Sequence, residues 1–358
     1  MADRPRIWLL IGDKPGDNAQ ARALAEALSW PYEVRQVFPK PEWVLGKPRF
    51  EPGLDHLDPV RSAVLEPPWP DLILTVGRRP SMAALWVQDR SAGCAQIVLL
   101  GRPKRWAHRF ALIVAPRQFK IPPRDNLIQL DLPLLRVDRA AVAAAADAWR
   151  ERLSGLAPPL TAILIGGATK PFRFDSAAAA TLMDELQRIR ARDGGTLYIS
   201  TSRRTRPDVV ESLEGALPRG AILYRWSPQT AADNPYLALL AHADRFVVTG
   251  DSVSMMVEVA SMGRPLAIYA LPMGASVVDR ARALAAQLPV PGIVTHALHR
   301  LGIAGYSRDL GEISRLLIER GLAVPLGAPF RSSATALEDE LAPVVARIRD
   351  LVTRAAVA

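Results

Sequence analysis

The stretch 243–265, with the sequence ADRFVVTGDSVSMMVEVASMGRP, decides how the rest of the chain is interpreted. It predicts a strand at Arg245–Thr249, a tight turn at Gly250–Ser252 and a helix from about Asp251 to about Met262. Gly263 supplies the residue that ends such a helix. The stretch therefore predicts one strand-turn-helix unit of an α/β protein.

This unit has the properties of an anion site. A helix that directly follows a strand points its free N–H groups and positive dipole end at the carboxyl edge of the sheet. Glu258 lies four residues after Ser254, one turn further along the same helix face. Amides and hydroxyls for phosphate, beside a carboxylate for ribose hydroxyls, suit a nucleoside diphosphate.

The composition is that of a globular protein with an unusual charge. With 358 residues, 49% of them hydrophobic and 23% charged, the chain is long enough for two domains. Lys and Arg number 45 against 36 Asp and Glu, and nearly all the basic residues are Arg. We attribute the Arg excess first to genome base composition and second to recognition of phosphate or carboxylate. A basic surface would favour anionic substrates or anionic lipid headgroups.

Other features argue against several classes of protein. The single Cys94 excludes an internal disulfide, and the histidines show no metal-ligand spacing, so we expect no metal and no cofactor. No apolar run reaches the roughly 18 residues of a membrane span, and the run Ile7–Ile11 is too short for a signal peptide. We expect a cytoplasmic protein, with peripheral association at the inner membrane as an alternative. Scattered Arg residues without interleaved aromatic residues argue against nucleic acid as a partner.

Short apolar runs alternate with amphipathic stretches, and this alternation occurs twice along the chain. It predicts parallel sheets with helices on both faces. The predicted strands are 7–11, 71–76, 96–100, 111–115, 126–130, 162–166, 196–200, 221–225, 245–249 and 266–270. The predicted helices are 17–28, 81–89, 140–153, 176–191 and 251–262. We place an N-terminal domain at 1–155, a second domain at 156–330 and a C-terminal helix within 331–358.

Two segments do not follow the alternation. The segment 38–70 is rich in Pro and Trp, and we expect a long loop or short helices there, with Trp43 and Trp69 buried. The last segment has apolar residues at helical spacing from Leu337 to Leu351. Pro343 lies among them and predicts a kink or a late helix start.

The loop Gly12–Gln20 follows the first predicted strand. Its two glycines allow a ligand to approach, but their spacing is not the G-x-G-x-x-G of dinucleotide-binding folds. Asp17 and Gln20 suit a capping box at the start of the next helix. If Asp17 caps the helix, Asp13 is left as the reactive carboxylate.

Three later loops also place glycines, hydroxyls and basic residues after predicted strands: Gly77–Ser81, Gly166–Lys170 and Thr201–Thr205. The second is not a Walker A loop, although a glycine pair beside Lys can approach a phosphate. The third combines two Arg with hydroxyls and suits an anion clamp. Each loop alone is equally compatible with an ordinary basic turn. Their shared position at strand ends is what favours one binding site.

Five motifs in order resemble the mitochondrial-fission Elm family, whose bacterial members are regarded as glycosyltransferases with a glycosyltransferase B fold. The motifs are GDNAQ at 16–20, GRR at 77–79, IGG at 165–167, SRRT at 202–205 and VVTGDSVSMMVE at 247–258. The resemblance covers about residues 7–272. It implies two Rossmann-like domains that face a cleft, with the C-terminal helix packed back on the first. It also implies a nucleotide-sugar donor and a glycan or lipid-linked acceptor.

By this resemblance the donor would contact the second domain through Gly167, Lys170, Ser202, Arg203, Arg204, Asp251, Ser252, Ser254, Met255 and Glu258. Glu258 would hold the ribose, and the basic residues would balance the charge of the leaving nucleotide. The acceptor side would comprise Gly12, Asn18, Gln20, Gly77, Arg78 and Arg79. Asp13 or Asp17 would be the general base for the acceptor hydroxyl.

Three functions follow as alternatives. The first is a glycosyltransferase that acts on a cell-envelope acceptor. The second is a non-catalytic scaffold or regulatory protein, because plant members of the family act in organelle division. The third is a nucleoside-diphosphate-sugar epimerase of the same fold, which would add acid and base carboxylates over the sugar ring.

Overall fold

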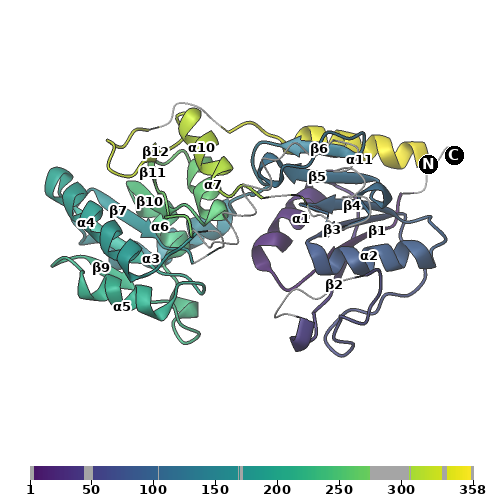
Figure 1. Cartoon of the computed structure of the whole chain (residues 1–358), viewed down its shortest axis with the longest axis horizontal. Helices are drawn as coiled ribbons and strands as arrows, with labels where there is room; N and C mark the ends of the chain where they lie inside the picture. The colour runs from purple at the N-terminus through teal and green to yellow at the C-terminus, as the bar shows by residue number, and fades with distance from the viewer. Residues whose placement is uncertain are drawn as a thin grey trace. The chain divides into compact units, whose positions relative to one another are not determined.

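Two compact units make up the chain in the computed structural model, each around its own six-stranded parallel sheet (Figure 1). The structure describes residues 4–43, 51–103, 105–167, 169, 172–274, 306, 308–332 and 337–355. Unit 1 comprises 1–136, 290–309 and 338–358, and unit 2 comprises 137–289 and 310–337. The predicted α/β fold with two Rossmann-like halves is confirmed.

Unit 1 has the strand order β2-β1-β3-β4-β5-β6, and all neighbouring strands are parallel. Its strands are β1 (Ile7–Ile11), β2 (Glu33–Gln36), β3 (Leu72–Val76), β4 (Gln96–Leu100), β5 (Leu112–Pro116) and β6 (Leu127–Leu130). Its helices are α1 (Pro15–Leu28), α2 (Arg78–Arg90) and α11 (Leu341–Ala355), with 3-10 turns η1 (Pro41–Trp43), η2 (Ala107–Arg109) and η3 (Arg117–Phe119).

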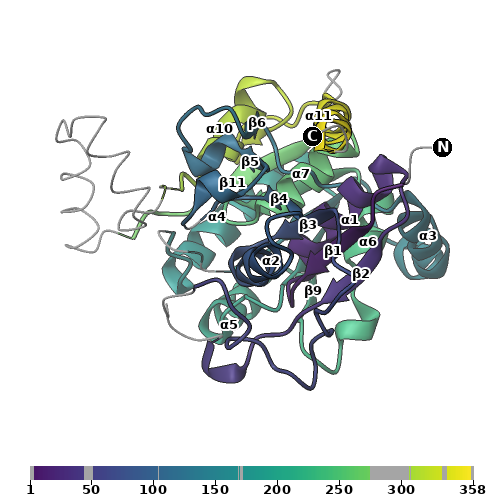
Figure 2. The same cartoon turned by 90° about the vertical axis from the view of Figure 1, so that its right-hand side faces the viewer.

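The core of unit 1 lies on both faces of its sheet. Along β1, Leu9 packs into a cluster with α1 and α11, and the next residue, Leu10, packs into a cluster with α2. Both side chains are fully buried. Figure 2 shows α2 against β1 and β3. Because parallel strands between two helical layers are buried on both faces, the apolar run Ile7–Ile11 is continuous rather than alternating.

Unit 2 has the strand order β12-β11-β10-β7-β8-β9, again with parallel neighbours. Its strands are β7 (Leu160–Leu164), β8 (Thr196–Ser200), β9 (Ile222–Tyr224), β10 (Arg245–Thr249), β11 (Leu266–Tyr269) and β12 (Val324–Pro325). Its helices are α3 (Arg139–Ser154), α4 (Ser176–Asp193), α5 (Pro207–Gly215), α6 (Tyr236–His242), α7 (Val253–Ser261) and α10 (Glu312–Glu319), with the turn η4 (Ala231–Asp233). Read in chain order, the sheet is the 3-2-1-4-5-6 sheet of Rossmann folds.

The structure moves several predicted boundaries. The units divide after Arg136 rather than after 155, because α3 packs against α6 of unit 2. α1 begins at Pro15 and not at Asp17, since proline suits the first helical position. α2 begins at Arg78, so the two basic residues that were assigned to a loop lie in its first turn.

The C-terminal helix packs on unit 1 as predicted. α11 contacts α1, and its buried Val344 and Ile348 join the core cluster on that face of the sheet. It begins only at Leu341, so Pro343 falls in its first turn and the late start is confirmed. In the segment 38–70, the described part contains η1, and Trp43 and Trp69 pack partly buried against the core.

Candidate functional site

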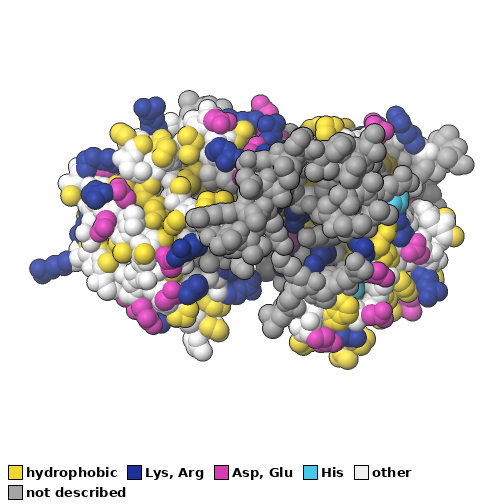
Figure 3. Space-filling model, viewed as in Figure 1, with side chains coloured by type: hydrophobic (Ala, Val, Ile, Leu, Met, Phe, Trp, Pro, Cys, Tyr) yellow, Lys and Arg dark blue, Asp and Glu magenta, His cyan; other side chains and the backbone are white. Residues whose placement is uncertain are grey.

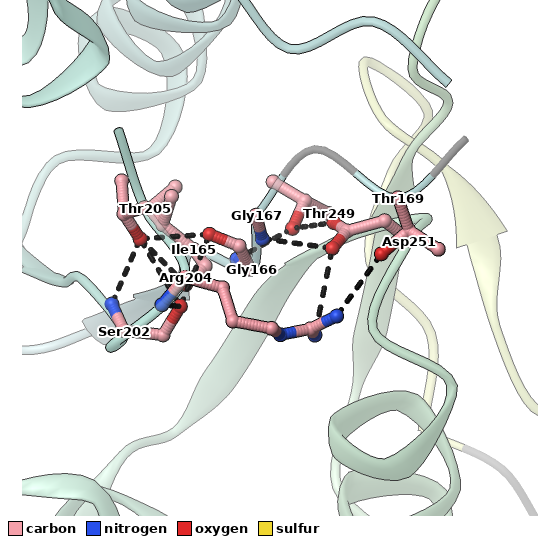
Figure 4. A network of polar contacts seen from close by, with 9 residues as sticks. All are labelled: Ile165, Gly166, Gly167, Thr169, Ser202, Arg204, Thr205, Thr249 and Asp251. Atoms are coloured by element: carbon pink, nitrogen blue, oxygen red, sulfur yellow. Dashed lines mark hydrogen bonds and ion pairs between the residues drawn. The ribbon is translucent and has the colours of Figure 1, made fainter. Parts of the chain in front are cut away.

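In unit 2, three strand-end loops meet at the point where the chain changes direction across the sheet. β7 and β10 are neighbours, but the strands that follow β7 extend the sheet to one side and those after β10 to the other. Open α/β sheets bind ligands outside the carboxyl ends of such a pair of strands. The loops after β7, β8 and β10 gather there, as Figure 4 shows.

Asp251 joins two of these loops. One carboxylate oxygen accepts the N–H of Gly167 at 2.8 Å, and the other accepts the hydroxyl of Thr249 at 2.8 Å. The Thr249 hydroxyl in turn accepts the N–H of Gly166 at 2.8 Å. The Asp251 side chain is fully buried, and burial raises the pKa of its carboxyl. Its observed contacts are those of a brace between the β7 and β10 loops.

The two glycines after β7 are required by close packing. A Cβ on Gly166 would lie 2.4 Å from an Asp251 carboxylate oxygen, and one on Gly167 would lie 2.2 Å from the carbonyl oxygen of Arg204. No side chain fits at either position. The glycine pair that the sequence presents as a ligand loop therefore also allows the three loops to approach one another.

The loop after β8 contributes hydroxyls and one cation. The hydroxyls of Ser202 and Thr205 donate to the carbonyl oxygen of Gly166 at 3.1 and 2.7 Å. The half-exposed Arg204 guanidinium donates to Thr169 at 3.0 Å and lies 3.6 Å from Asp251. Of the other two basic residues predicted for the donor site, Arg203 is exposed, and Lys170 lies outside the described residues.

The beginning of α7 carries a buried hydroxyl with no partner. Ser252 is the N-cap residue and only 1% exposed, yet within the described chain its Oγ makes no hydrogen bond. Within the described residues, the first N–H of α7 that donates to a backbone carbonyl is that of Met256, which donates to Ser252 at 3.1 Å. The earlier amides, including those of the half-buried Ser254 and Met255, lie in the turn where helices leave N–H groups free.

Glu258, one turn into α7, is held by a residue that sequence reasoning missed. The hydroxyl of Tyr236, from α6, donates a short hydrogen bond to one Glu258 carboxylate oxygen. Burial raises the pKa of Glu258, and burial together with the Glu258 charge raises the pKa of Tyr236. No local pattern connects residues 22 positions apart, so the sequence carries no signal for this pair. Thr249 could have been found as a hydroxyl residue that ends a strand.

Unit 1 has its own switch point, between β1 and β3. The loops after these strands line a pocket of about 190 Å³ formed by Gly12, Asp13, Lys14, Asp17, Asn18, Val76, Gly77, Arg78, Arg79 and Pro80. The structure therefore brings together both candidate general bases and all but one of the predicted acceptor-side residues. The exception is Gln20, whose amide donates weakly to the carbonyl oxygen of Gly16 at 3.5 Å.

The predicted capping box at the start of α1 is wrong. Lys14 is the N-cap residue, and no side chain caps the helix there. Asp17 instead lies within the first turn and lines the pocket, with Lys14 4.0 Å from its carboxylate. Burial raises the pKa of Asp17. Asp13 is paired with Arg79 at 3.5 Å.

Comparison with known proteins shows which family the chain belongs to. The family model described as mitochondrial fission ELM1 matches residues 15–316. The chain belongs to this family. An uncharacterized protein of Rickettsia prowazekii is 26% identical over 298 residues, which are 74% of this chain and 82% of that protein. The mitochondrial fission protein ELM1 of Arabidopsis thaliana is 26% identical over 219 residues, which are 55% of this chain and 51% of the plant protein.

Solved structures agree on the fold. UDP-GlcNAc 2-epimerase from Methanocaldococcus jannaschii superposes with a TM-score of 0.50 at 10% identity, over 96% of this chain and 99% of that one. The catalytic domain of starch synthase IV from Arabidopsis thaliana gives a TM-score of 0.47 at 12% identity, over 99% and 100%. The first of these shows a shared fold of two Rossmann-like units, the pairing that defines glycosyltransferase B folds.

Three further observations concern the surface and ligands. Within the part of the chain that the structure describes, no group of three or more His, Cys, Asp or Glu residues is placed to hold a metal ion. No described helix is long and apolar enough to cross a membrane. On the face shown in Figure 3, Lys and Arg side chains are scattered among acidic and apolar ones rather than gathered in one patch.

Proposed function

We propose that this protein of the ELM1 family is a glycosyltransferase that moves a sugar from a nucleotide-sugar to an acceptor of the cell envelope. The observation that carries the proposal is the buried Ser252 hydroxyl, which has no partner in the described chain and lies at the start of α7 beside the switch point of unit 2. A buried hydroxyl without a partner is costly, about 1–3 kcal/mol, and a phosphate oxygen would remove that cost.

The donor binds unit 2 with its diphosphate at the start of α7. The amides of Ser254 and Met255 and the Ser252 hydroxyl donate to phosphate oxygens, helped by the helix dipole. Glu258, oriented by Tyr236, accepts the ribose hydroxyls. Arg204, with Arg203 and Lys170, balances the charge that develops on the leaving nucleotide, so the transfer proceeds without a metal ion.

The acceptor binds the pocket of unit 1, and Asp17 is the better candidate for the general base. Burial raises the pKa of Asp17 toward the range in which a carboxylate accepts a proton efficiently. Asp13 is already engaged in an ion pair with the Arg79 guanidinium at 3.5 Å. A lipid-linked acceptor would place the protein peripherally at the cytoplasmic side of the inner membrane.

Titration calorimetry with UDP, GDP, CDP and ADP tests the donor site. One nucleotide should bind preferentially, and Ser252→Ala should weaken its binding about tenfold, as expected for one lost hydrogen bond to a charged group. Ser261→Ala is the matched control, since Ser261 lies at the other end of α7 and its hydroxyl donates to the carbonyl oxygen of Glu258. Absence of binding at millimolar concentrations of all four nucleotides would refute the donor site.

Product analysis separates the alternative functions. The fold shared with a UDP-GlcNAc 2-epimerase makes epimerisation the second candidate. Loss of the donor only when membrane extract is added supports transfer. An isomeric nucleotide-sugar formed without any acceptor supports the epimerase, and tight binding without turnover under either condition supports a scaffold.

A further inference from the structure

The pocket at the switch point of unit 1 has a size and charge that select its ligand. We propose that it binds a phosphomonoester, so that the acceptor of the proposed reaction carries a phosphate group near the hydroxyl that receives the sugar. Only the statement that this ligand is the acceptor rests on the proposed function. The pocket itself is argued from unit 1 alone.

The volume limits what the pocket can hold. At about 190 Å³ it is smaller than the roughly 300–1,000 Å³ of pockets that enclose whole drug-sized ligands. A nucleotide-sugar does not fit, whereas one phosphate group with the first atoms of its ester does. The pocket therefore recognises one end of a ligand whose remainder lies outside it.

Positive charge is in excess on the lining. Lys14, Arg78 and Arg79 face the pocket together with Asp13 and Asp17, so the cations outnumber the carboxylates. Burial lowers the pKa of Arg78, and so does repulsion from the neighbouring positive charge of Arg79. A bound dianion would relieve that repulsion. A planar guanidinium also matches the geometry of phosphate oxygens better than an ammonium does.

The backbone supports the same choice of ligand. The carbonyl oxygen of Gly12, which would repel an anion, accepts the side-chain amides of Asn18 at 2.9 Å and Gln36 at 3.2 Å. Gly77 has φ of 83°, a conformation that favours glycine, and precedes the first turn of the 13-residue α2. Neither α1 nor α2 has a side chain that caps its start. The side-chain cations are thus joined by the positive ends of two helices.

Asp17 explains why the phosphate must lie near a hydroxyl. A Cβ on Gly77 would lie 3.6 Å from the Asp17 carboxylate, so this carboxylate lies directly against Gly77, the residue before the two Arg residues in the first turn of α2. A ligand whose phosphate contacts Arg78 then presents a hydroxyl a few bonds away to Asp17. Transfer breaks the bond from the sugar to the nucleotide diphosphate and forms one from the sugar to this hydroxyl oxygen. The hydroxyl proton passes to Asp17.

Binding of three small probes to the full chain tests the pocket: glycerol 3-phosphate, glycerol and inorganic phosphate. Glycerol 3-phosphate and phosphate should bind and glycerol should not. Arg78→Gln should weaken both by about tenfold or more, the effect of one lost charge-assisted hydrogen bond. Arg22→Gln, on the exposed face of α1, removes the same charge elsewhere and should leave binding unchanged. Equal affinity in Arg78→Gln, Arg22→Gln and the unchanged protein overturns the proposal.

Two further arms cover misfolding and the source of the phosphate. Lys14→Gln alters a side chain that is 68% exposed, so we expect the fold to be kept. Because Lys14 lines the pocket, this variant should also weaken phosphate binding, and no effect counts against the pocket. Flotation assays compare phosphatidylcholine vesicles with and without phosphatidic acid. If Arg78→Gln abolishes only the additional binding that phosphatidic acid gives, the source of the phosphate is a lipid headgroup. Absence of binding to every phosphate probe overturns the proposal.

The same titrations distinguish this inference from the proposed function. Ser252→Ala changes only unit 2 and should weaken nucleotide binding while glycerol 3-phosphate binding stays unchanged. If no nucleotide binds but glycerol 3-phosphate binding depends on Arg78, the donor site fails and the phosphate pocket stands. If nucleotides bind and phosphate probes do not, the pocket fails and the donor site stands.

Discussion

Single residues at the unit 2 switch point are divided between holding the loops together and facing a ligand. Asp251 belongs to the first group, because its buried carboxylate accepts the N–H of Gly167 and the hydroxyl of Thr249. Asp251→Ala leaves both donors without that acceptor and should lower the free energy of unfolding by about 1–3 kcal/mol for each. Asp251→Asn keeps one acceptor oxygen and should lose less. Urea denaturation measures both, and an unchanged stability of Asp251→Ala would contradict the brace.

Tyr236 belongs to neither group, because it orients Glu258 without facing a ligand itself. Tyr236→Phe removes the donor to the Glu258 carboxylate and should weaken binding of the preferred nucleotide about tenfold, since a hydrogen bond to a charged group is worth about 1.5–3 kcal/mol. Tyr224→Phe is the matched control, because its hydroxyl bonds the carbonyl oxygen of Thr230 at 2.7 Å. Calorimetry that shows equal losses in both variants would exclude a positioning role.

The sequence predicts which residues gather at the two switch points better than it predicts what each residue does. Placement follows from parallel sheets, whose strand ends lie at one edge, so Gly167, Ser202, Arg204 and Asp251 meet as expected. Roles depend on side-chain direction. Asp251 turns back to a glycine amide, and no periodicity encodes that turn. Tyr236 reaches Glu258 from another helix, which only the folded chain determines.

At the scale of elements, the loop after β7 depends on glycine because three loops converge on it. Gly167→Ala places a Cβ 2.2 Å from a backbone oxygen of Arg204, which cannot rotate away as a side chain could. Thermal and urea unfolding should show a loss of about 1–3 kcal/mol, as for other overpacked sites. Gly215→Ala, in α5, meets nothing within 4 Å and should be neutral or slightly stabilising. Equal stability of the two variants would mean that the loop relaxes freely.

At the amino end of β10 in the same sheet, an ion pair contributes to stability, and this contribution depends on pH. Asp193, at the end of α4, bonds Arg192 and the buried Arg245 that begins β10. These guanidiniums, Arg192 first, lower the pKa of Asp193 to about 2 from 3.8. When folding lowers the pKa of a carboxyl, its ionised form stabilises the folded state fully at pH values above the pKa of the unfolded state. This stabilisation is lost as the pH falls through the pKa of the folded state. The pair therefore stabilises unit 2 at neutral pH and weakens below about pH 4.

Asp193→Asn should therefore cost roughly 1–2 kcal/mol at pH 7, after allowance for solvent screening, and the difference from the unchanged protein should shrink toward pH 2. Urea denaturation at pH 7, 4 and 3 measures it. Asp184→Asn, on the exposed face of α4, is the control and should not alter the slope. A constant difference at all three pH values would show that the ion pair does not titrate in this range.

Strands buried on both faces were predictable, whereas two of the four edge strands, β2 and β12, were not. β1, β3, β7 and β10 are mostly apolar and buried along their whole length because helices cover both of their faces. β2 carries the polar sequence EVRQ, and β12 has two residues, so neither presents a strand pattern. Helices α5, α6 and α10 are only seven to nine residues long, too short for a clear helical period.

At the scale of the whole molecule, each unit has its own core, although the segments that form a unit are not consecutive in the chain. The chain leaves unit 1 after Arg136 and returns to it at its end, where α11 supplies Ile348 to the core around α1. The large cluster around α4 draws only on residues of unit 2. A cavity made in either core should therefore loosen the unit that contains it, however far apart its segments lie in the sequence.

Hydrogen exchange read by mass spectrometry tests this division. Ile348→Ala removes a fully buried side chain from α11 and should cost about 2–5 kcal/mol. Faster exchange should then appear more than 270 residues upstream, in β1, β3 and α1, and not in β7 or β10. Leu182→Ala makes an equally buried deletion in α4 and should give the reverse pattern. If Ile348→Ala speeds exchange only within α11, the helix is a surface appendage and not part of the unit 1 core. If either variant speeds exchange in both units, the chain folds as one cooperative body, and ligand-binding effects of substitutions in one unit could no longer be assigned to that unit alone.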